Sequence, residues 1–148
     1  MRSAPSLRAT KPTQILLVDD NAHGLVARRT VLEELGYTIV SASSAREALL
    51  LFEKHKFDLI VTDYRMPGMD GVVLIKELRE RQFGNPIILL SGFLAHLGLT
   101  EQSTGADMLI QKSSNETDQL VRGVKRLLGM KKPAASQTRV VKSKASNA

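Results

Sequence analysis

Residues 59–78 read LIVTDYRMPGMDGVVLIKEL, and this stretch predicts one complete unit of a strand followed by a helix. The run Leu59–Val61 is too short for a helix and has no apolar–polar alternation, which is typical of a strand buried on both faces. A turn with Pro and Gly follows, and Asp70 is a residue type that caps the N-terminal end of helices. Beyond it, small and apolar residues recur at helical spacing: Gly71, Leu74, Ile75 and Leu78.

The same alternation extends in both directions along the chain. Short apolar runs predict four more strands: Ile15–Val18, Tyr37–Val40, Ile87–Leu90 and Met108–Ile110. Apolar residues at helical spacing predict further helices: Ala27, Val31 and Leu35; Ala45, Ala48, Leu49 and Phe52; Leu120, Val124, Leu127 and Leu128. The segment 94–104 has the weakest helical pattern, because Gly98 interrupts it. Five strand–helix units in this order predict an α/β fold, (βα)5, with a doubly wound parallel sheet.

Polar residues and glycines mark the ends of the predicted helices. Asn21 and Ser44 precede helical stripes and, like Asp70, predict N-caps. Gly36 and Gly129 follow stripes, at the position where glycine commonly ends a helix.

The composition is that of one globular domain. The chain has 148 residues, of which 43% are hydrophobic and 24% charged. The absence of cysteine excludes disulfides and thiolate chemistry, and it fits the reducing conditions of the cytoplasm, where we expect the protein. The longest nearly apolar stretch, Ile87–Leu99, is shorter than the roughly 20 residues of a membrane span and is broken by polar residues. We therefore expect no association with a membrane.

The net charge of +6 comes from the two ends of the chain. Residues 1–14 and 131–148 contain eight basic residues and no acidic ones, whereas residues 15–130 contain 13 basic and 15 acidic residues. We expect a flexible tail at 1–13, one folded domain at 14–130 and a basic, disordered tail at 131–148. The tails hold no aromatic residue for stacking on bases, so a role in binding nucleic acid is a weaker alternative.

Polar residues follow four of the five predicted strands. Asp19 and Asp20 follow the first strand, Asp63 the third, Ser91 the fourth and Lys112 the fifth. Each of them alone is a common turn or cap residue, but parallel strands bring their carboxyl ends to one edge, where ligands bind. Three carboxylates together repel one another unless a cation offsets them, and hard oxygen ligands suit Mg²⁺. A lysine at the same edge is suited to a phosphoryl oxygen.

These motifs resemble the receiver domain of two-component response regulators. The resemblance rests on Asp19-Asp20, the segment DYRMPGMDG from Asp63 to Gly71, Ser91-Gly92 and Lys112, and it covers about residues 14–129. It implies a flavodoxin-like sheet of five parallel strands in the order 2-1-3-4-5. It also implies a site in which an aspartate accepts a phosphoryl group.

The resemblance assigns the metal and the nucleophile. Asp63 would attack phosphorus and form an aspartyl phosphate. Asp20 and Asp63 would bind Mg²⁺ directly, together with the backbone carbonyl of Arg65, and Asp19 would act through water or as a second ligand. The metal would offset the charge between the attacking carboxylate and the phosphoryl oxygens.

The resemblance also assigns the groups that hold the phosphoryl oxygens. Lys112 would pair with one oxygen and the Ser91 hydroxyl would donate to another, with backbone N–H groups near Tyr64, Arg65 and Gly92.

Two positions depart from the family. Ser113 follows the site lysine where proline is usual, and Leu109 occupies the position of an aromatic residue that couples phosphorylation to the surface. The phosphorylation chemistry is therefore expected to be complete, and its coupling to the surface unusual.

The function implied is a signalling switch controlled by phosphorylation. The chain would accept a phosphoryl group from a histidine kinase or a histidine phosphotransfer protein and signal through protein–protein contacts. It would catalyse only its own Mg²⁺-dependent phosphorylation and dephosphorylation. Only 18 residues follow Met130, so we expect a receiver that stands alone, without an output domain. The alternatives are a receiver fold used as an interaction module without phosphorylation, and a nucleic-acid-associated protein that uses its basic tails.

Overall fold

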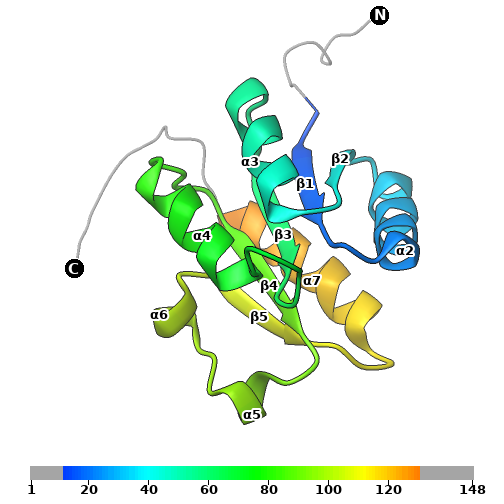
Figure 1. The fold of residues 1–148 in the computed structure, drawn as a ribbon. Helices are drawn as coiled ribbons and strands as arrows, with labels where there is room; N and C mark the ends of the chain where they lie inside the picture. Colours follow the sequence, from blue (N-terminus) through cyan, green and yellow to red (C-terminus); the bar gives the residue numbers. More distant parts are fainter. Residues whose placement is uncertain (1–11, 131–148) are drawn as a thin grey trace, which may run out of the picture.

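The computed structural model describes residues 12–130, which form five parallel strands in the order β2-β1-β3-β4-β5 (Figure 1). The strands are β1 (Gln14–Val18), β2 (Thr38–Ala42), β3 (Leu59–Asp63), β4 (Ile87–Ser91) and β5 (Met108–Gln111). The helices are α2 (Ala22–Glu34), α3 (Ala45–Lys54), α4 (Gly71–Glu80), α5 (Leu94–Leu97), α6 (Glu101–Thr104) and α7 (Glu116–Met130). The predicted doubly wound sheet and its strand order are confirmed. The predictions for residues 1–11 and 131–148 lie outside the described residues.

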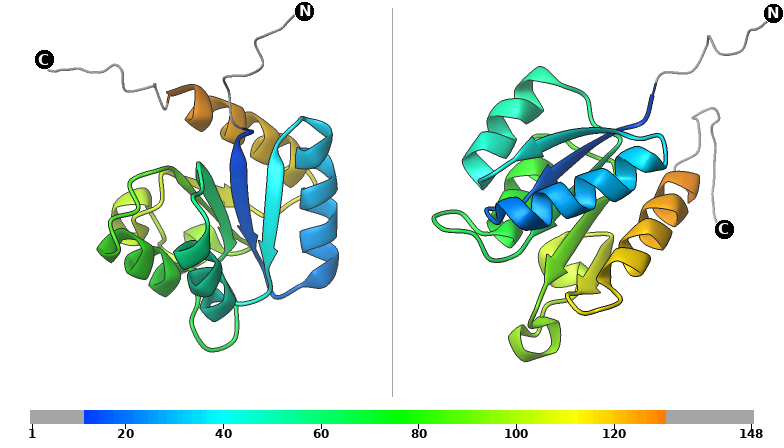
Figure 2. Two further views of the ribbon diagram at one scale, coloured as in Figure 1. Left: turned by 90° about the horizontal axis from the view of Figure 1, so that it is seen from above. Right: turned by 90° about the vertical axis from the view of Figure 1, so that its right-hand side faces the viewer.

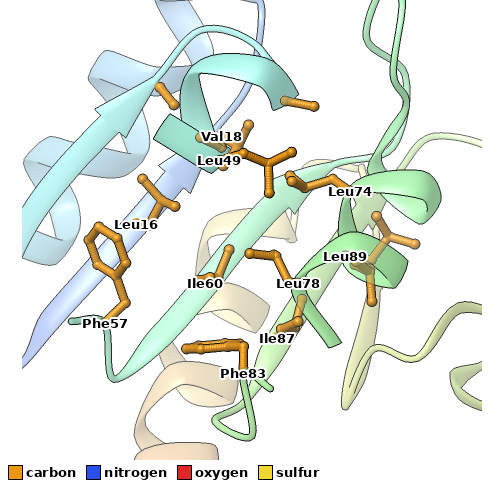
Figure 3. Close-up of a cluster of buried hydrophobic side chains, with 14 of the residues drawn as sticks. Leu16, Val18, Leu49, Phe57, Ile60, Leu74, Leu78, Phe83, Ile87 and Leu89 are labelled. Carbon is orange, nitrogen blue, oxygen red and sulfur yellow. The ribbon is translucent and has the colours of Figure 1, made fainter. Parts of the chain in front are cut away.

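Helices cover both faces of the sheet (Figure 2). In β1, Leu16 and Val18 point into the core beneath α3 and α4, while Ile15 and Leu17 point into the core beneath α2 and α7. This alternation follows from the period of two in a strand. Figure 3 shows the first of these cores, in which residues of β1, β3 and β4 pack against the apolar faces of α3 and α4. The central strands β1, β3 and β4 are therefore buried on both faces, as their unbroken apolar runs predict, whereas the edge strands β2 and β5 are partly exposed.

The three predicted N-caps are confirmed. The side chains of all three caps accept a hydrogen bond from the backbone N–H three residues later. The pairs are Asn21 with Gly24, Ser44 with Glu47, and Asp70 with Val73. Among the predicted helix ends, Gly36 has a left-handed φ of 99° just after α2. Gly129, however, lies inside α7, so the prediction that it ends the helix is wrong.

The buried face of α2 differs from the predicted one. Ala27 and Leu35 are exposed, and the buried residues are Arg28 and Leu32. The pattern of apolar residues missed this face because its central residue is an arginine whose charge is paired inside the protein.

Segment boundaries also differ in detail. β2 begins at Thr38 and continues to Ala42, because its backbone pairs with all five residues of β1. The segment 94–104 forms two helices of four residues each, α5 and α6, and Gly98 in the left-handed region ends the first. Within residues 12–130, no helix is long and apolar enough to cross a lipid bilayer.

Candidate functional site

A cleft of about 560 Å³ opens at the carboxyl ends of β1, β3, β4 and β5. It is lined by all the residues predicted as metal ligands, nucleophile or side-chain partners of the phosphoryl group: Asp19, Asp20, Asp63, Arg65, Ser91 and Lys112. Asp63 and Ser91 are the last residues of their strands, whereas Asp19 and Lys112 directly follow theirs. The parallel sheet is therefore what brings residues almost a hundred positions apart to one edge.

Three carboxylates meet in this cleft. Asp19, Asp20 and Asp63 each offer an oxygen, and these oxygens lie within 4.8 Å of one another. Asp19 is 1% exposed and Asp63 4% exposed, whereas Asp20 is open to solvent. Buried carboxylates this close repel one another, and a divalent cation with oxygen ligands removes that repulsion. The residues present therefore fit a hard cation such as Mg²⁺.

Lys112 pairs with Asp63 across the cleft. Its Nζ lies 2.5 Å from Asp63 Oδ1, and its backbone N–H donates to the carbonyl of Ser91 at 2.9 Å. Burial raises the pKa of the Asp63 carboxyl above its usual range; the hydrogen bond from Lys112 opposes that shift, and the charge of Asp19 adds to it. The Lys112 side chain is one-third exposed and lines the cleft, whereas that of Asp63 is almost fully buried.

Asp19 is held by a partner that the sequence patterns did not reveal. Its Oδ2 lies 2.6 Å from Nη1 of Arg28, and its Oδ1 accepts from the backbone N–H of Asn21 at 2.9 Å. Burial alone would lower the pKa of the Arg28 guanidinium, but hydrogen bonds to Asp19 and Glu116 raise it, so this arginine stays charged. The signal in the sequence is a charged residue between Leu25 and Leu32, at positions that share a helix face.

Ser91 is buried, and its hydroxyl oxygen accepts a hydrogen bond from the backbone N–H of Phe93 at 3.1 Å. The loop beyond it is held by Gln111, a second residue that sequence patterns missed. The side chain of Gln111 donates to the carbonyl of Gly92 at 2.5 Å and accepts from the N–H of Leu94 at 3.2 Å. Both ends of this amide therefore link β5 to the β4–α5 loop.

Three further features concern residues predicted to lie near the phosphoryl group. The N–H of Tyr64 donates to the carbonyl of Leu90 at 2.8 Å and is therefore already engaged. Arg65 lines the cleft, and its guanidinium carbon lies 5.7 Å from the centre of the Phe93 ring. The Lys112–Ser113 peptide bond is trans, as are all peptide bonds of residues 12–130.

Comparison with known proteins gives a consistent assignment. The family model of the response regulator receiver domain matches residues 15–125. The transcriptional regulatory protein PhoP of alkaline phosphatase synthesis, from Bacillus subtilis, is 35% identical over 119 residues, which cover 76% of this chain and 48% of PhoP. The virulence sensor protein BvgS of Bordetella pertussis is 32% identical over 113 residues, which cover 68% of this chain and 9% of BvgS. The chain thus spans less than half the length of either relative.

Solved structures of the response regulator TrrA from Thermotoga maritima have the same fold. TrrA in complex with Mg²⁺-BeF has a TM-score of 0.69 and 34% identity, with 78% of this chain and 98% of that chain covered. TrrA in complex with the histidine kinase ThkA has a TM-score of 0.69 and 35% identity, with the same coverage of both chains.

Proposed function

The chain belongs to the response regulator receiver domain family, which acts in phosphorelay signalling, and we propose that Asp63 is the residue that accepts its phosphoryl group. One observation carries this proposal: the Asp63 carboxylate ends the central strand β3, with Lys112 at 2.5 Å and two further carboxylates within 4.8 Å. A nucleophilic oxygen, a cation for the phosphoryl group and ligands for a metal are therefore next to one another. Phosphoryl transfer needs little more from a protein than this positioning of charges.

Asp20 and Asp63 would hold Mg²⁺ directly, together with the backbone carbonyl of Arg65. When bound, the metal lowers the repulsion between an anionic nucleophile and an anionic phosphoryl group. Asp20 suits direct ligation because its carboxylate is exposed and forms no ion pair within residues 12–130. The TrrA complex with Mg²⁺-BeF supports a metal and a phosphoryl-like group at a site of this kind.

The reaction follows from the groups in the cleft. An oxygen of Asp63 attacks phosphorus, an acyl phosphate bond forms, and the bond between phosphorus and the donor breaks. The electron pair of that bond stays on the donor atom, which is a ring nitrogen if the donor is a phosphohistidine. Lys112 then turns from the Asp63 carboxylate to a phosphoryl oxygen, and the Ser91 hydroxyl donates to another. Hydrolysis of the acyl phosphate returns Asp63 to its starting state.

The proposed donor is a histidine kinase or a histidine phosphotransfer protein. The structure of TrrA with ThkA supports a partner of this class. The phosphorylated chain would then act through contacts with another protein. On this proposal its chemistry is limited to its own phosphorylation and dephosphorylation.

The test is incubation with Mg²⁺ and acetyl phosphate, followed by intact mass measurement. We expect the mass to increase by one phosphoryl group, and we expect no increase without Mg²⁺ or in Asp63→Asn and Asp20→Ala. Asp118→Asn is the matched control, because Asp118 is an exposed aspartate of α7 that pairs with Arg122 and does not line the cleft.

A phosphoryl group found on another residue of Asp63→Asn would refute the assignment of the site. A wild-type chain that gains no mass from acetyl phosphate or from a phosphorylated donor protein would instead be a receiver fold that serves as an interaction module.

A further inference from the structure

Arg28 lies inside the protein between the acidic cleft and the first turn of α7. Its Nη1 is 2.6 Å from Asp19 Oδ2, its Nη2 is 2.7 Å from Glu116 Oε2, and its Nε donates to the same oxygen at 2.8 Å. The residue is only 8% exposed. A buried guanidinium needs anionic partners, and a planar guanidinium can bind two carboxylates at once. Arg28 therefore bridges two acidic groups from segments 97 residues apart.

The helix that carries Arg28 leaves room for this bridge. Gly24 lies one turn before Arg28, and a Cβ atom on Gly24 would come within 2.9 Å of Asp19 Oδ2 and 3.0 Å of Arg28 Nη1. Glycine is unfavourable inside a helix because it adds flexibility to the unfolded chain. At this position its absent side chain is what allows the ion pair to form without a steric clash.

The bridge determines what Asp19 can do. One oxygen of Asp19 faces Arg28 and the other accepts from the N–H of Asn21, so both have protein donors. Each of these oxygens has a further lone pair, so a metal bound directly to Asp19 would share an oxygen with one of the two donors and weaken that interaction. A guanidinium this close to the cleft also repels a divalent cation.

The same bridge reaches the β5–α7 connection. Lys112, at the start of this connection, pairs with Asp63, and Glu116, four residues later, pairs with Arg28. Two ion pairs therefore fasten one short segment to the acidic cleft. A charge that arrives in the cleft acts on both pairs, and through Glu116 on the first turn of α7.

Resting on the proposed metal-dependent function, we propose that Arg28 is a positioning residue: it holds Asp19 back from direct ligation, keeps Mg²⁺ binding weak, and couples the metal site to α7 through Glu116. Binding of Mg²⁺ loosens the hold of Arg28 on Asp19 and Glu116, and removal of Arg28 tightens Mg²⁺ binding. By linkage, the strength of the bridge and the affinity for Mg²⁺ oppose each other by the same factor.

The first test is the Mg²⁺ affinity of the full chain, measured by isothermal calorimetry. We expect Arg28→Leu to bind Mg²⁺ on the order of tenfold more tightly, within the range typical of coupled sites. Arg29→Leu is the matched control, because Arg29 is the next residue of the same helix, is exposed and pairs with Glu33. We expect the control to keep the wild-type affinity. If Arg28→Leu binds with wild-type or lower affinity, or if both variants bind more tightly to the same extent, the proposal is wrong.

A second variant keeps the proposal testable if Arg28→Leu does not fold. Gly24→Ala retains Arg28, but its new methyl group would lie too close to Asp19 and Arg28 and should weaken their ion pair. We therefore expect this variant also to bind Mg²⁺ more tightly. Gly129→Ala is its control, because a Cβ at this position of α7 meets nothing within 4 Å. An affinity of Gly24→Ala equal to that of its control would overturn the proposal by itself.

The coupling to α7 has its own measurement, amide hydrogen exchange with and without Mg²⁺. We expect Mg²⁺ to change the exchange of residues 116–120 in the wild type but not in Glu116→Gln, in which the charge of the bridge is lost. An equal response in both proteins would refute the coupling. If the wild type binds no Mg²⁺, the proposed function is refuted. If the wild type binds Mg²⁺ and is phosphorylated, but Arg28→Leu and Arg29→Leu bind Mg²⁺ with the same affinity, only the role of Arg28 is refuted.

Discussion

At the scale of single residues, the proposed role of Asp63 and its surroundings have opposite effects on the ionisation of its carboxyl group. It must be ionised to act as a nucleophile, yet its burial and the neighbouring Asp19 disfavour the charged form. Lys112 offsets part of this cost through its hydrogen bond, but the pKa of Asp63 stays above its usual range. Carboxylates in a cleft whose pKa is shifted by burial and by a neighbouring charge are common at functional sites.

The raised pKa predicts how stability depends on pH in the absence of metal. Between the ordinary pKa of an unfolded aspartate and the higher pKa of folded Asp63, the folded state binds more protons than the unfolded state. The free energy of unfolding therefore falls as the pH rises through this window. Asp63→Asn removes the ionisable group but keeps an oxygen that can accept from Lys112. We expect the variant to melt at a higher temperature than the wild type at neutral pH.

Thermal unfolding in the presence of a metal chelator, measured between pH 3 and pH 8, tests this expectation. The advantage of Asp63→Asn should vanish as the pH falls through the window, because the wild-type carboxyl is then neutral as well. Asp118→Asn is the control and should change stability by at most about 0.5 kcal/mol, since Asp118 is exposed and its ion pair with Arg122 is long. A variant that is less stable than the wild type at neutral pH would show that the pair with Lys112 outweighs burial.

The sequence revealed some of these residues and not others for a physical reason. Asp63, Ser91 and Lys112 stand at the ends of apolar runs, so local patterns locate them. Arg28 and Glu116 are 88 residues apart, and only the packing of α2 against α7 brings them together. The local pattern places Arg28 on the helix face of Leu25 and Leu32, but it does not identify the two carboxylates that pair with the arginine.

At the scale of the elements, the start of α4 lies unusually close to the end of β3. Gly71 is the first residue of α4, and its N–H donates to the carbonyl of Tyr64 at 2.8 Å. A Cβ at this position would lie 2.4 Å from the carbonyl oxygen of Asp63 and 3.0 Å from Cα of Tyr64. Both neighbours are backbone atoms, which cannot move aside as a flexible side chain can.

We therefore expect Gly71→Ala to lower the free energy of unfolding by about 1–3 kcal/mol, the usual cost of overpacking. This loss runs against the higher helix propensity of alanine, which alone would stabilise the helix. The rate of phosphorylation should fall as well, because the new methyl group presses on the backbone of the proposed acceptor. Denaturant unfolding and the acetyl phosphate assay measure the two effects. Gly84→Ala is the control, because a Cβ there meets nothing within 4 Å; equal stability of the two variants would contradict the prediction.

The β4–α5 loop lines the cleft, and the two short helices beyond it bury few of their residues. α5 and α6 have four residues each, α5 buries none of them, and Phe93 is 54% exposed. Leu109, in β5, has no polar group that gains from a move between solvent and core. A change driven by phosphorylation should therefore be carried by residues 91–104 rather than by β5.

Hydrogen exchange with Mg²⁺ and beryllofluoride, a mimic of the phosphoryl group, tests this expectation. Protection should change most in residues 91–104 and less at Leu109. Gln111→Ala should raise exchange in the same loop before any ligand is added, because it removes the two hydrogen bonds to Gly92 and Leu94. Asp63→Asn with the same additions is the control. A dominant response in β5 with a silent loop would mean that Leu109 moves after all.

At the scale of the whole molecule, the order of short apolar runs and helical stripes predicted a parallel (βα)5 sheet, and the resemblance to the receiver family supplied the strand order 2-1-3-4-5. The central strands β1, β3 and β4 are buried on both faces, so their apolar runs are unbroken, and parallel strands need a helix between them. Two details depended on contacts that the order does not contain. The buried face of α2 rests on an ion pair, and the break between α5 and α6 rests on the left-handed backbone of Gly98.

The last prediction concerns the ends of the chain. Every residue of the proposed site, including Arg28 and Glu116, lies within residues 12–130, which contain 13 basic and 15 acidic residues. The eight remaining basic residues lie outside this range. Phosphoryl transfer depends on positioned groups a few ångströms from phosphorus. We therefore expect a chain of residues 12–130 to be phosphorylated by acetyl phosphate within about twofold of the full-length rate.

The comparison is made at near-physiological salt, after thermal unfolding has shown that the shortened chain melts cooperatively. A second donor, a phosphorylated histidine phosphotransfer protein, separates chemistry from recognition. Loss of rate with both donors would mean that the terminal segments support the site itself and would contradict the prediction. If the shortened chain loses rate only with the protein donor, the basic ends recognise the donor surface. In that case the rate of the full-length chain with the protein donor should also fall steeply as salt is added, as expected for association steered by charge.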